Sequence, residues 1–151
     1  MKKFYELLDT KFQLPVFLKL TPLTEKSPHV EVWLNNHRIY AGNPITEVAI
    51  HHYISSRDFI KLKFTITGKN YTEDNTSAII FQALTVDGVD LKPHVTQRAE
   101  YKTDQDWGVY DKPTDHFGWN GTWYFESNKP FFHLKHEIKN YGWMLTPRTT
   151  K

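Results

Sequence analysis

The chain has 151 residues, nineteen Lys plus Arg, seventeen Asp plus Glu and no cysteine. This length suits a single domain with a sizeable core. The absence of cysteine excludes a disulfide framework and a thiolate metal site, and a formal net charge of +2 gives no reason to expect nucleic acid as the partner.

Residues 1–12 are expected to form an N-terminal arm or a short helix. They lack the apolar segment of a secretory signal, and no stretch of the chain approaches the roughly 20 apolar residues of a membrane span. We therefore expect an intracellular origin and no membrane partner. The arm carries Phe4, Tyr5, Leu7 and Leu8, which make it too apolar to be left in water. These four residues are candidates for docking against another protein.

The next segments alternate between strand formers and turn residues. Gln13–Leu20 is predicted to be a strand, with Pro15 favouring an edge position or the start of the strand. Val30–Tyr40 (VEVWLNNHRIY) is predicted to be a hairpin that turns at Asn35-Asn36, because Asn tolerates the positive φ of a tight turn.

The region from Ile45 to Leu91 is predicted to supply most of the core. Ile45–Tyr53 is expected to be a strand, and Arg57–Thr67 alternates apolar and polar residues with period two, which is typical of a half-buried strand. Ser77–Leu91 (SAIIFQALTVDGVDL) is expected to contain a central strand covered on both faces and, between Val86 and Val89, a tight turn at Asp87-Gly88. The predicted core residues are Ile60, Leu62, Phe64, Ile66, Ile80 and Leu84.

The C-terminal third begins with a long polar segment in place of closely spaced strands. Lys92–Asp115 is polar and is expected to be a long excursion with one strand near Gln97–Tyr101. Phe117–Phe125 (FGWNGTWYF) is predicted to be a hairpin that turns at Asn120-Gly121. A helix is expected at about residues 129–141, capped by Ser127 or Asn128.

Short strands with frequent turn signals predict an all-β fold. The expected architecture is an antiparallel β-sandwich of the immunoglobulin-like or jelly-roll-like kind with one C-terminal helix. A single domain would span residues 13–145, and residues 146–151 would form a tail.

Histidines and carboxylates offer weak candidates for a metal site. His133 and His136 lie three residues apart in the predicted helix, whereas His51 and His52 are adjacent in a predicted strand and point to opposite faces. The segment from Asp104 to Asp115 has some spacing of a calcium loop, but Gly108 falls at the fifth place rather than the sixth. We therefore expect no cofactor and no metal requirement for folding, with a looser calcium site between loops as the alternative.

The sequence contains no recognised catalytic motif, and a structural role explains each candidate residue equally well. The chain has no phosphate loop, nucleophile elbow or dinucleotide fingerprint, so the prediction is that the protein is not an enzyme. The aromatic residues Trp107, Tyr110, Trp119 and Trp123 lie close together in sequence near acidic residues. They are candidates either for core and protein-interface contacts or for stacking on sugar rings.

Two stretches carry a resemblance to known proteins. VEVWLNNHRIY and AIIFQALTVDGVDL resemble small calcium-dependent carbohydrate-binding modules of the sandwich type, and more specifically small β-sandwich virion proteins of large tailed bacteriophages. GWNGTWYFESNKPFFHLKHEIKNYGWMLTP is similar to the C-terminal part of those phage proteins.

The resemblance implies a non-enzymatic structural component of a phage particle. Such a protein would attach to the capsid, neck, tail or baseplate, would be made in the host cytoplasm, and would assemble in multiple copies with other virion proteins. The alternative is a carbohydrate-binding module for recognition of a glycan or host surface.

Overall fold

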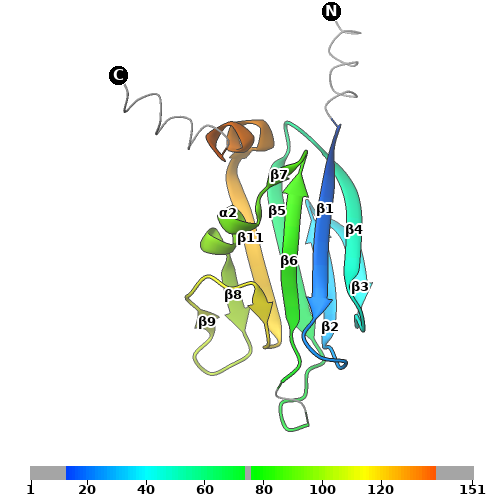
Figure 1. The fold of residues 1–151 in the computed structure, drawn as a ribbon. Helices are drawn as coiled ribbons and strands as arrows, with labels where there is room; N and C mark the ends of the chain where they lie inside the picture. The colour runs from blue at the N-terminus through cyan, green and yellow to red at the C-terminus, as the bar shows by residue number, and fades with distance from the viewer. Residues whose placement is uncertain (1–12, 74–75, 139–151) are drawn as a thin grey trace, which may run out of the picture.

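The computed structural model describes residues 13–73 and 76–138, which form two antiparallel sheets packed face to face (Figure 1). The first sheet has the order β10-β6-β1-β4, with β7 paired to β6, and the second has the order β3-β2-β5-β11-β8-β9. The first sheet contains β1 (Gln13–Pro22), β4 (Val48–Ser55), β6 (Ile79–Val86), β7 (Val89–Asp90) and β10 (His116–Phe117). The second contains β2 (His29–Leu34), β3 (His37–Gly42), β5 (Phe59–Thr67), β8 (Glu100–Thr103), β9 (Val109–Tyr110) and β11 (Gly121–Pro130).

The fold is therefore the predicted antiparallel β-sandwich. Strand β5 shows why, because its inward residues are buried and its alternate residues reach the surface. The predicted core residues on this strand are at most 1% exposed, and they pack on the inner face of the first sheet. Those residues are Ile60, Leu62, Phe64 and Ile66.

Two predicted turns are confirmed by their backbone geometry. Asn35 and Asn36 have φ of 50° and 69° and join β2 to β3. Asp87 and Gly88 have φ of 52° and 76° and join β6 to β7. Positive φ at both central residues matches the right-handed twist of the flanking strands.

The edge position predicted for Pro15 is wrong, although its place near the strand start is confirmed. Strand β1 lies in the middle of the first sheet, between β4 and β6 (Figure 1). The proline lacks only an N–H, and its carbonyl still accepts a hydrogen bond from the Asp87 N–H at 2.8 Å. The strand therefore tolerates Pro15 without being displaced to the edge.

Strand β6 is central as predicted, but it is covered on one face only. Ile79 and Phe81 are fully buried, whereas Ile80 is half-buried and Gln82 is exposed. A register shift opposite Lys19 and Leu20 skips Gln82, so the alternation changes phase before Leu84, which is buried. The prediction that Ile80 lies in the core is wrong because this bulge was not visible in the sequence.

The excursion after β7 is more regular than predicted. It begins with helix α2 (Lys92–Arg98), which has a proline in its first turn and buries Val95. The strand predicted near Gln97–Tyr101 exists as β8, shifted toward the C-terminus, and β9 pairs with it.

The predicted hairpin at Phe117–Phe125 is wrong. Strand β10 pairs with β6 in the first sheet, whereas β11 pairs with β5 and β8 in the second. The chain therefore crosses from one sheet to the other over residues 118–120. Phe117 and Trp123 meet in the core from opposite sheets, with ring centroids 5.5 Å apart.

The C-terminal helix is present over residues 131–138 and starts later than predicted. Ser127 does not cap it, because the Ser127 hydroxyl accepts a hydrogen bond from the Ile60 N–H at 2.9 Å and donates one to the Lys129 carbonyl at 2.8 Å. These bonds hold a bulge between Glu126 and Pro130. The predicted end of the helix lies outside the described residues.

Backbone carbonyls at the β4–β5 turn satisfy the first amides of this helix. The Phe131 N–H donates to Asp58 and the Phe132 N–H donates to Ser56, so the helix needs no side-chain cap. Within residues 13–73 and 76–138, neither helix has the length and apolar character needed to cross a membrane.

Candidate functional site

Three aromatic side chains pack together beside β8 and β9, the two strands at the lower left of the sandwich in Figure 1. Trp107 lies on the β8–β9 connection, Tyr110 ends β9, and Trp119 lies on the crossing between the sheets. The Trp107 and Trp119 ring centroids are 4.9 Å apart at 81°, and those of Tyr110 and Trp119 are 5.3 Å apart. We call Trp107, Tyr110 and Trp119 the aromatic cluster.

The β8–β9 connection is a tight loop that presents Trp107 to solvent. The Thr103 N–H and hydroxyl both donate to the Gly108 carbonyl, and the Gly108 N–H donates to the Gln105 carbonyl. Gly108 has φ of 77°, a conformation that glycine adopts without steric cost. The Trp107 side chain is 51% exposed as a result.

A buried tyrosine fixes the backbone of Trp119. The Tyr101 hydroxyl donates to the Trp119 carbonyl and accepts from the Trp119 N–H at 3.0 Å. Burial raises the pKa of the Tyr101 phenol, so the hydroxyl keeps its proton and both hydrogen bonds at neutral pH.

A polar network adjoins the aromatic cluster. The Tyr71 hydroxyl donates to Asp104 Oδ1 at 2.6 Å and accepts from the Asn120 N–H at 2.8 Å. Asp104 also accepts from Gln105 Nε2 at 3.0 Å and from Asn120 Nδ2 at 3.4 Å. Burial alone would raise the pKa of Asp104, but hydrogen bonds from Tyr71, Gln105 and Asn120 lower it overall. Asp104 is therefore an ionised carboxylate at neutral pH.

Lys69 connects this network to the interior. Its backbone pairs with the side chain of Asn120, which accepts from the Lys69 N–H at 3.0 Å and donates to the Lys69 carbonyl at 2.8 Å. The Lys69 ammonium donates to the carbonyls of Ser77 and Gly118 at 2.6 and 2.7 Å. Lys69 is only 9% exposed.

A pocket of about 280 Å³ opens beside the aromatic cluster. It lies where Lys69, residues 76–78, the segment before β10 and the crossing between the sheets come together. Two members of the aromatic cluster contribute to its lining, and Trp107 adjoins them. The lining residues are Leu23, Lys69, Thr76, Ser77, Ala78, Tyr110, Thr114, His116, Gly118 and Trp119.

The structure brings together three of the predicted binding residues and separates the others. Trp107, Tyr110 and Trp119 form one cluster, but Trp123 is 1% exposed in the core. The prediction that Trp123 is a binding residue is wrong, because its ring offers no face to a partner. The arm residues Phe4, Tyr5, Leu7 and Leu8 lie outside the described residues.

Sequence reasoning missed the polar part of the site. Lys69, Tyr71 and Asn120 reach it from segments about 50 residues apart in the chain, and no local pattern links them. The Asn120-Gly121 pair was noticed only as a turn signal. In the structure, a Cβ at Gly121 would lie 2.1 Å from the Lys102 carbonyl oxygen, so the glycine allows β11 to approach β8.

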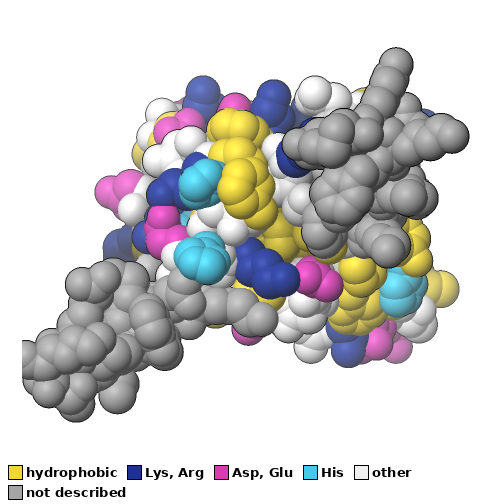
Figure 2. Space-filling view, turned by 90° about the horizontal axis from the view of Figure 1, so that it is seen from above, with side chains coloured by type: hydrophobic (Ala, Val, Ile, Leu, Met, Phe, Trp, Pro, Cys, Tyr) yellow, Lys and Arg dark blue, Asp and Glu magenta, His cyan; other side chains and the backbone are white. Residues whose placement is uncertain are grey.

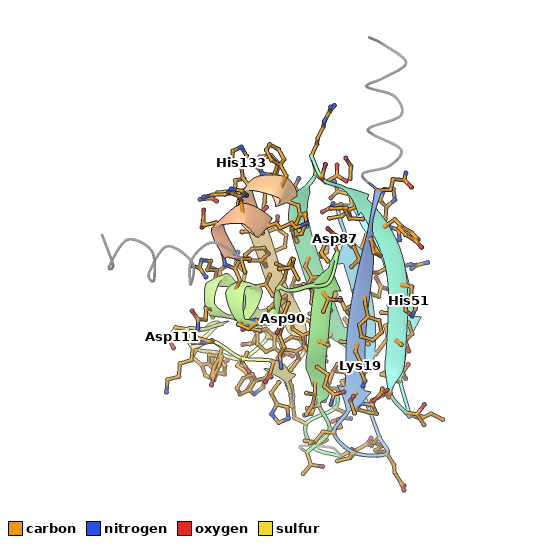
Figure 3. The ribbon with its side chains drawn as sticks, turned by 45° about the horizontal axis from the view of Figure 1, so that its top comes forward. Lys19, His51, Asp87, Asp90, Asp111 and His133 are labelled. Carbon is orange, nitrogen blue, oxygen red and sulfur yellow. The ribbon has the colours of Figure 1, made fainter. Side chains whose placement is uncertain are left out.

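The candidate metal ligands do not converge. Figure 3 shows His51 on β4 and His133 on the C-terminal helix in separate parts of the molecule. Asp115 forms an ion pair with Lys92 at 2.7 Å, and Asp104 is occupied by hydrogen bonds. Among the residues that the structure describes, no three His, Asp or Glu side chains are grouped so that they could hold a metal ion.

A second, larger groove lies toward the other end of the sandwich. It has a volume of about 520 Å³ and lies among the β2–β3 turn, the end of β4 and the start of β5, where Tyr53 is 62% and Phe59 is 42% exposed. Figure 2 views the molecule from that end and shows hydrophobic, basic, acidic and histidine side chains interspersed on the described surface. Among the described residues that line this groove, no cluster of aromatic rings comparable to that at Trp119 occurs.

The fold and the site define an antiparallel β-sandwich with an aromatic, partly charged pocket at one end. No family model matches the chain, and no curated protein matches it. One solved structure with a similar fold is vCBM60 in complex with galactobiose, with a TM-score of 0.49 and 8% identity over 74% of this chain and 97% of that chain.

A second similar structure is a selenomethionine form of vCBM60. It has a TM-score of 0.48 and 9% identity over 75% of this chain and 90% of that chain. It is described as part of an evolutionary link, through circular permutation, between two families of calcium-dependent carbohydrate binding modules. At this level of overlap neither structure assigns a ligand to this chain.

Proposed function

We propose that the protein is a non-catalytic carbohydrate-binding module whose site is the aromatic cluster and the adjoining pocket. The observation that carries the proposal is the exposed Trp107 ring packed against Trp119, which in turn lines a pocket with both polar and apolar walls. Sugars have apolar C–H faces and polar hydroxyl edges, so they suit aromatic rings beside a few fixed hydrogen-bonding groups.

The polar network supplies those hydrogen-bonding groups. Asp104 is an ionised acceptor with Gln105 beside it, and both side chains reach the surface next to Trp107. They would accept hydrogen bonds from sugar hydroxyls and donate to them while a ring stacks on the aromatic cluster.

The arrangement of the rings favours a soluble chain over a flat crystalline surface. Trp107 and Trp119 meet at 81°, so they form a corner rather than a coplanar wall. A single sugar unit at the end or side of an oligosaccharide fits such a corner, whereas an extended flat surface would contact only one ring.

The structural role in a phage particle remains a prediction from the resemblance alone. The arm that would dock against other virion proteins lies outside the described residues. The aromatic cluster, which both hypotheses use, therefore supplies the test between them.

Calorimetric titration with soluble oligosaccharides tests the proposal. Trp107→Ala should weaken binding by roughly two- to tenfold, since an aromatic stacking contact contributes about 0.5 to 1.5 kcal/mol. The melting temperature should stay close to that of the wild type because the ring is exposed.

Tyr53→Ala is the matched control, since it removes an exposed aromatic ring from the other end of the sandwich. It should leave binding unchanged. Equal losses in the two variants, or no binding of any oligosaccharide by the wild type, would contradict the proposal.

A further inference from the structure

The ammonium of Lys69 is an unusual group to find beside a sugar-sized pocket. A charged side chain that is only 9% exposed is normally paired with an opposite charge, since burial of an isolated charge is costly. Among the described residues, no carboxylate forms an ion pair with Lys69. Its two hydrogen-bond acceptors are neutral backbone carbonyls, those of Ser77 and Gly118.

The location of this charge follows from its hydrogen bonds. Lys69, Ser77 and Gly118 all line the pocket, so the ammonium lies at the pocket wall where its two acceptors meet. An ammonium has three N–H donors, and these two bonds leave one. The face of the Tyr71 ring, 5.8 Å from Nζ, provides a second weak contact but no opposite charge.

The rest of the lining strengthens the positive character of the pocket. Among the described residues that line it, none is Asp or Glu. The nearby Asp104 carboxylate is already held by Tyr71, Gln105 and Asn120. Asp104 keeps its negative charge but is not among the lining residues, so no carboxylate of the described lining opposes the ammonium inside the pocket, where water is partly excluded and charge interactions are stronger than in bulk solvent.

We infer that the pocket selects an acidic sugar, whose anionic substituent binds the Lys69 ammonium while its ring packs against Tyr110 and Trp119. This inference rests on the proposed function and adds the class of glycan. The volume of about 280 Å³ lies just below the roughly 300 to 1,000 Å³ of ligand pockets, so it suits one monosaccharide unit. Carboxylate and sulfate share the required chemistry, and the experiment separates them.

Lys69 also has a structural role, because its two hydrogen bonds tie the 68–78 connection to the crossing at Gly118. A variant of Lys69 alone would therefore not distinguish ligand binding from folding. The test begins with the wild-type protein and with ligand pairs that differ only in the anionic group.

The first pair is an oligogalacturonate and its methyl ester, and the second is a sulfated galactose oligosaccharide and its desulfated form. The anionic member of at least one pair should bind about tenfold or more tightly, because a hydrogen bond to a charged group is stronger than one between neutral groups. The advantage should shrink as sodium chloride rises from about 0.05 to 0.5 M, since salt screens the attraction. The pair that shows the larger difference identifies the substituent.

Lys69→Met provides the second measurement, since it keeps the aliphatic stem and removes the charge. Where the variant folds, it should lose the preference for the anionic member while it retains binding of the neutral member. If it fails to fold, the wild-type comparison and its salt dependence decide the question.

Equal affinity for both members of both pairs would overturn the inference and leave the proposed carbohydrate binding intact. Tighter binding of the neutral members would do the same. No binding of any of the four ligands would overturn both the inference and the proposed function.

Discussion

Two groups of aromatic side chains in this protein have similar composition and opposite uses. The core group comes from regular strands, and every ring in it is at most 1% exposed. The aromatic cluster comes from the connections and the short strand at one end, and Trp107 is 51% exposed. The core group comprises Phe64, Phe81, Phe117 and Trp123, whose neighbouring ring centroids lie 5.1–5.5 Å apart.

The contrast is sharpest between Trp119 and Trp123, which are four residues apart. Trp119 lies on the crossing between the sheets, where the chain has no strand alternation to direct a side chain inward. Trp123 lies within β11, two residues after Gly121, and alternation places its ring in the core. The regularity of the backbone, rather than the type of residue, decides which tryptophan is available to a ligand.

The largest expected effect is on the core side of this comparison. Phe64→Ala should lower the free energy of unfolding by about 3 to 5 kcal/mol, because it leaves a cavity among the core rings. Lys63→Ala, one residue earlier on β5, should cost about 0.5 kcal/mol or less. Urea unfolding measures both values, and similar losses at the two positions would show that the assigned strand register is wrong.

A smaller loss of stability is expected at Tyr101, which lies between the core group and the aromatic cluster. Tyr101→Phe removes the hydroxyl that bonds the Trp119 N–H and carbonyl, and it should cost about 1 to 3 kcal/mol of stability. It should also weaken sugar binding, although Tyr101 does not line the pocket.

Tyr124→Phe is the matched control for Tyr101→Phe. The Tyr124 hydroxyl donates a hydrogen bond to Glu126 at the surface. This hydrogen bond raises the pKa of Tyr124 to about 12. Its removal should leave both stability and binding nearly unchanged. A Tyr101→Phe variant with the stability and affinity of the wild type would contradict the role assigned to the buried hydroxyl.

The smallest expected effect is a pH dependence of stability, which arises from His94 at the edge of the core. The pKa of His94 is lowered mainly by burial, since its ring packs against Phe125. The positive charges of Arg98 and Lys129 lower this pKa further, whereas the negative charge of Glu137 raises it. The unfolded state therefore binds a proton at a higher pH than the folded state. Stability should decrease as the pH falls below about 6.5, through the unfolded-state pKa of histidine.

Unfolding measured at several pH values between about 7.5 and 5.5 tests this dependence, and His94→Gln should flatten it. Asp104 has a lowered pKa, so this carboxylate of the proposed site stays ionised over the same range. An unaltered pH profile in His94→Gln would assign the dependence to another group.

Local rules explain which parts of the fold were predictable. The alternation of β5 and the positive-φ pairs at Asn35-Asn36 and Asp87-Gly88 depend only on neighbouring residues, and all three were predicted correctly. The crossing at residues 118–120 depends on which sheet each flanking strand joins. Asn120-Gly121 satisfies the local rule for a hairpin, so the sequence favoured the wrong pairing.

The candidate site was predictable to the same extent. Trp107, Tyr110 and Trp119 are candidates because they lie close together in the sequence, and in the structure their rings are in contact. Lys69 gave no signal, because its role comes from a hydrogen bond to Gly118, 49 residues later in the chain. Its burial also contradicts the usual expectation that a lysine in a polar loop is solvated.

The hydrogen bonds between Tyr101 and the backbone of Trp119 have a thermodynamic consequence for recognition. They order the crossing while the protein folds, so a ligand that arrives at the pocket does not have to immobilise that part of the backbone. The loss of conformational entropy on binding is then confined to the sugar and to surface side chains such as Trp107. Differences in affinity among glycans should therefore report their contacts with the rings and the ammonium rather than differences in how far they rearrange the protein.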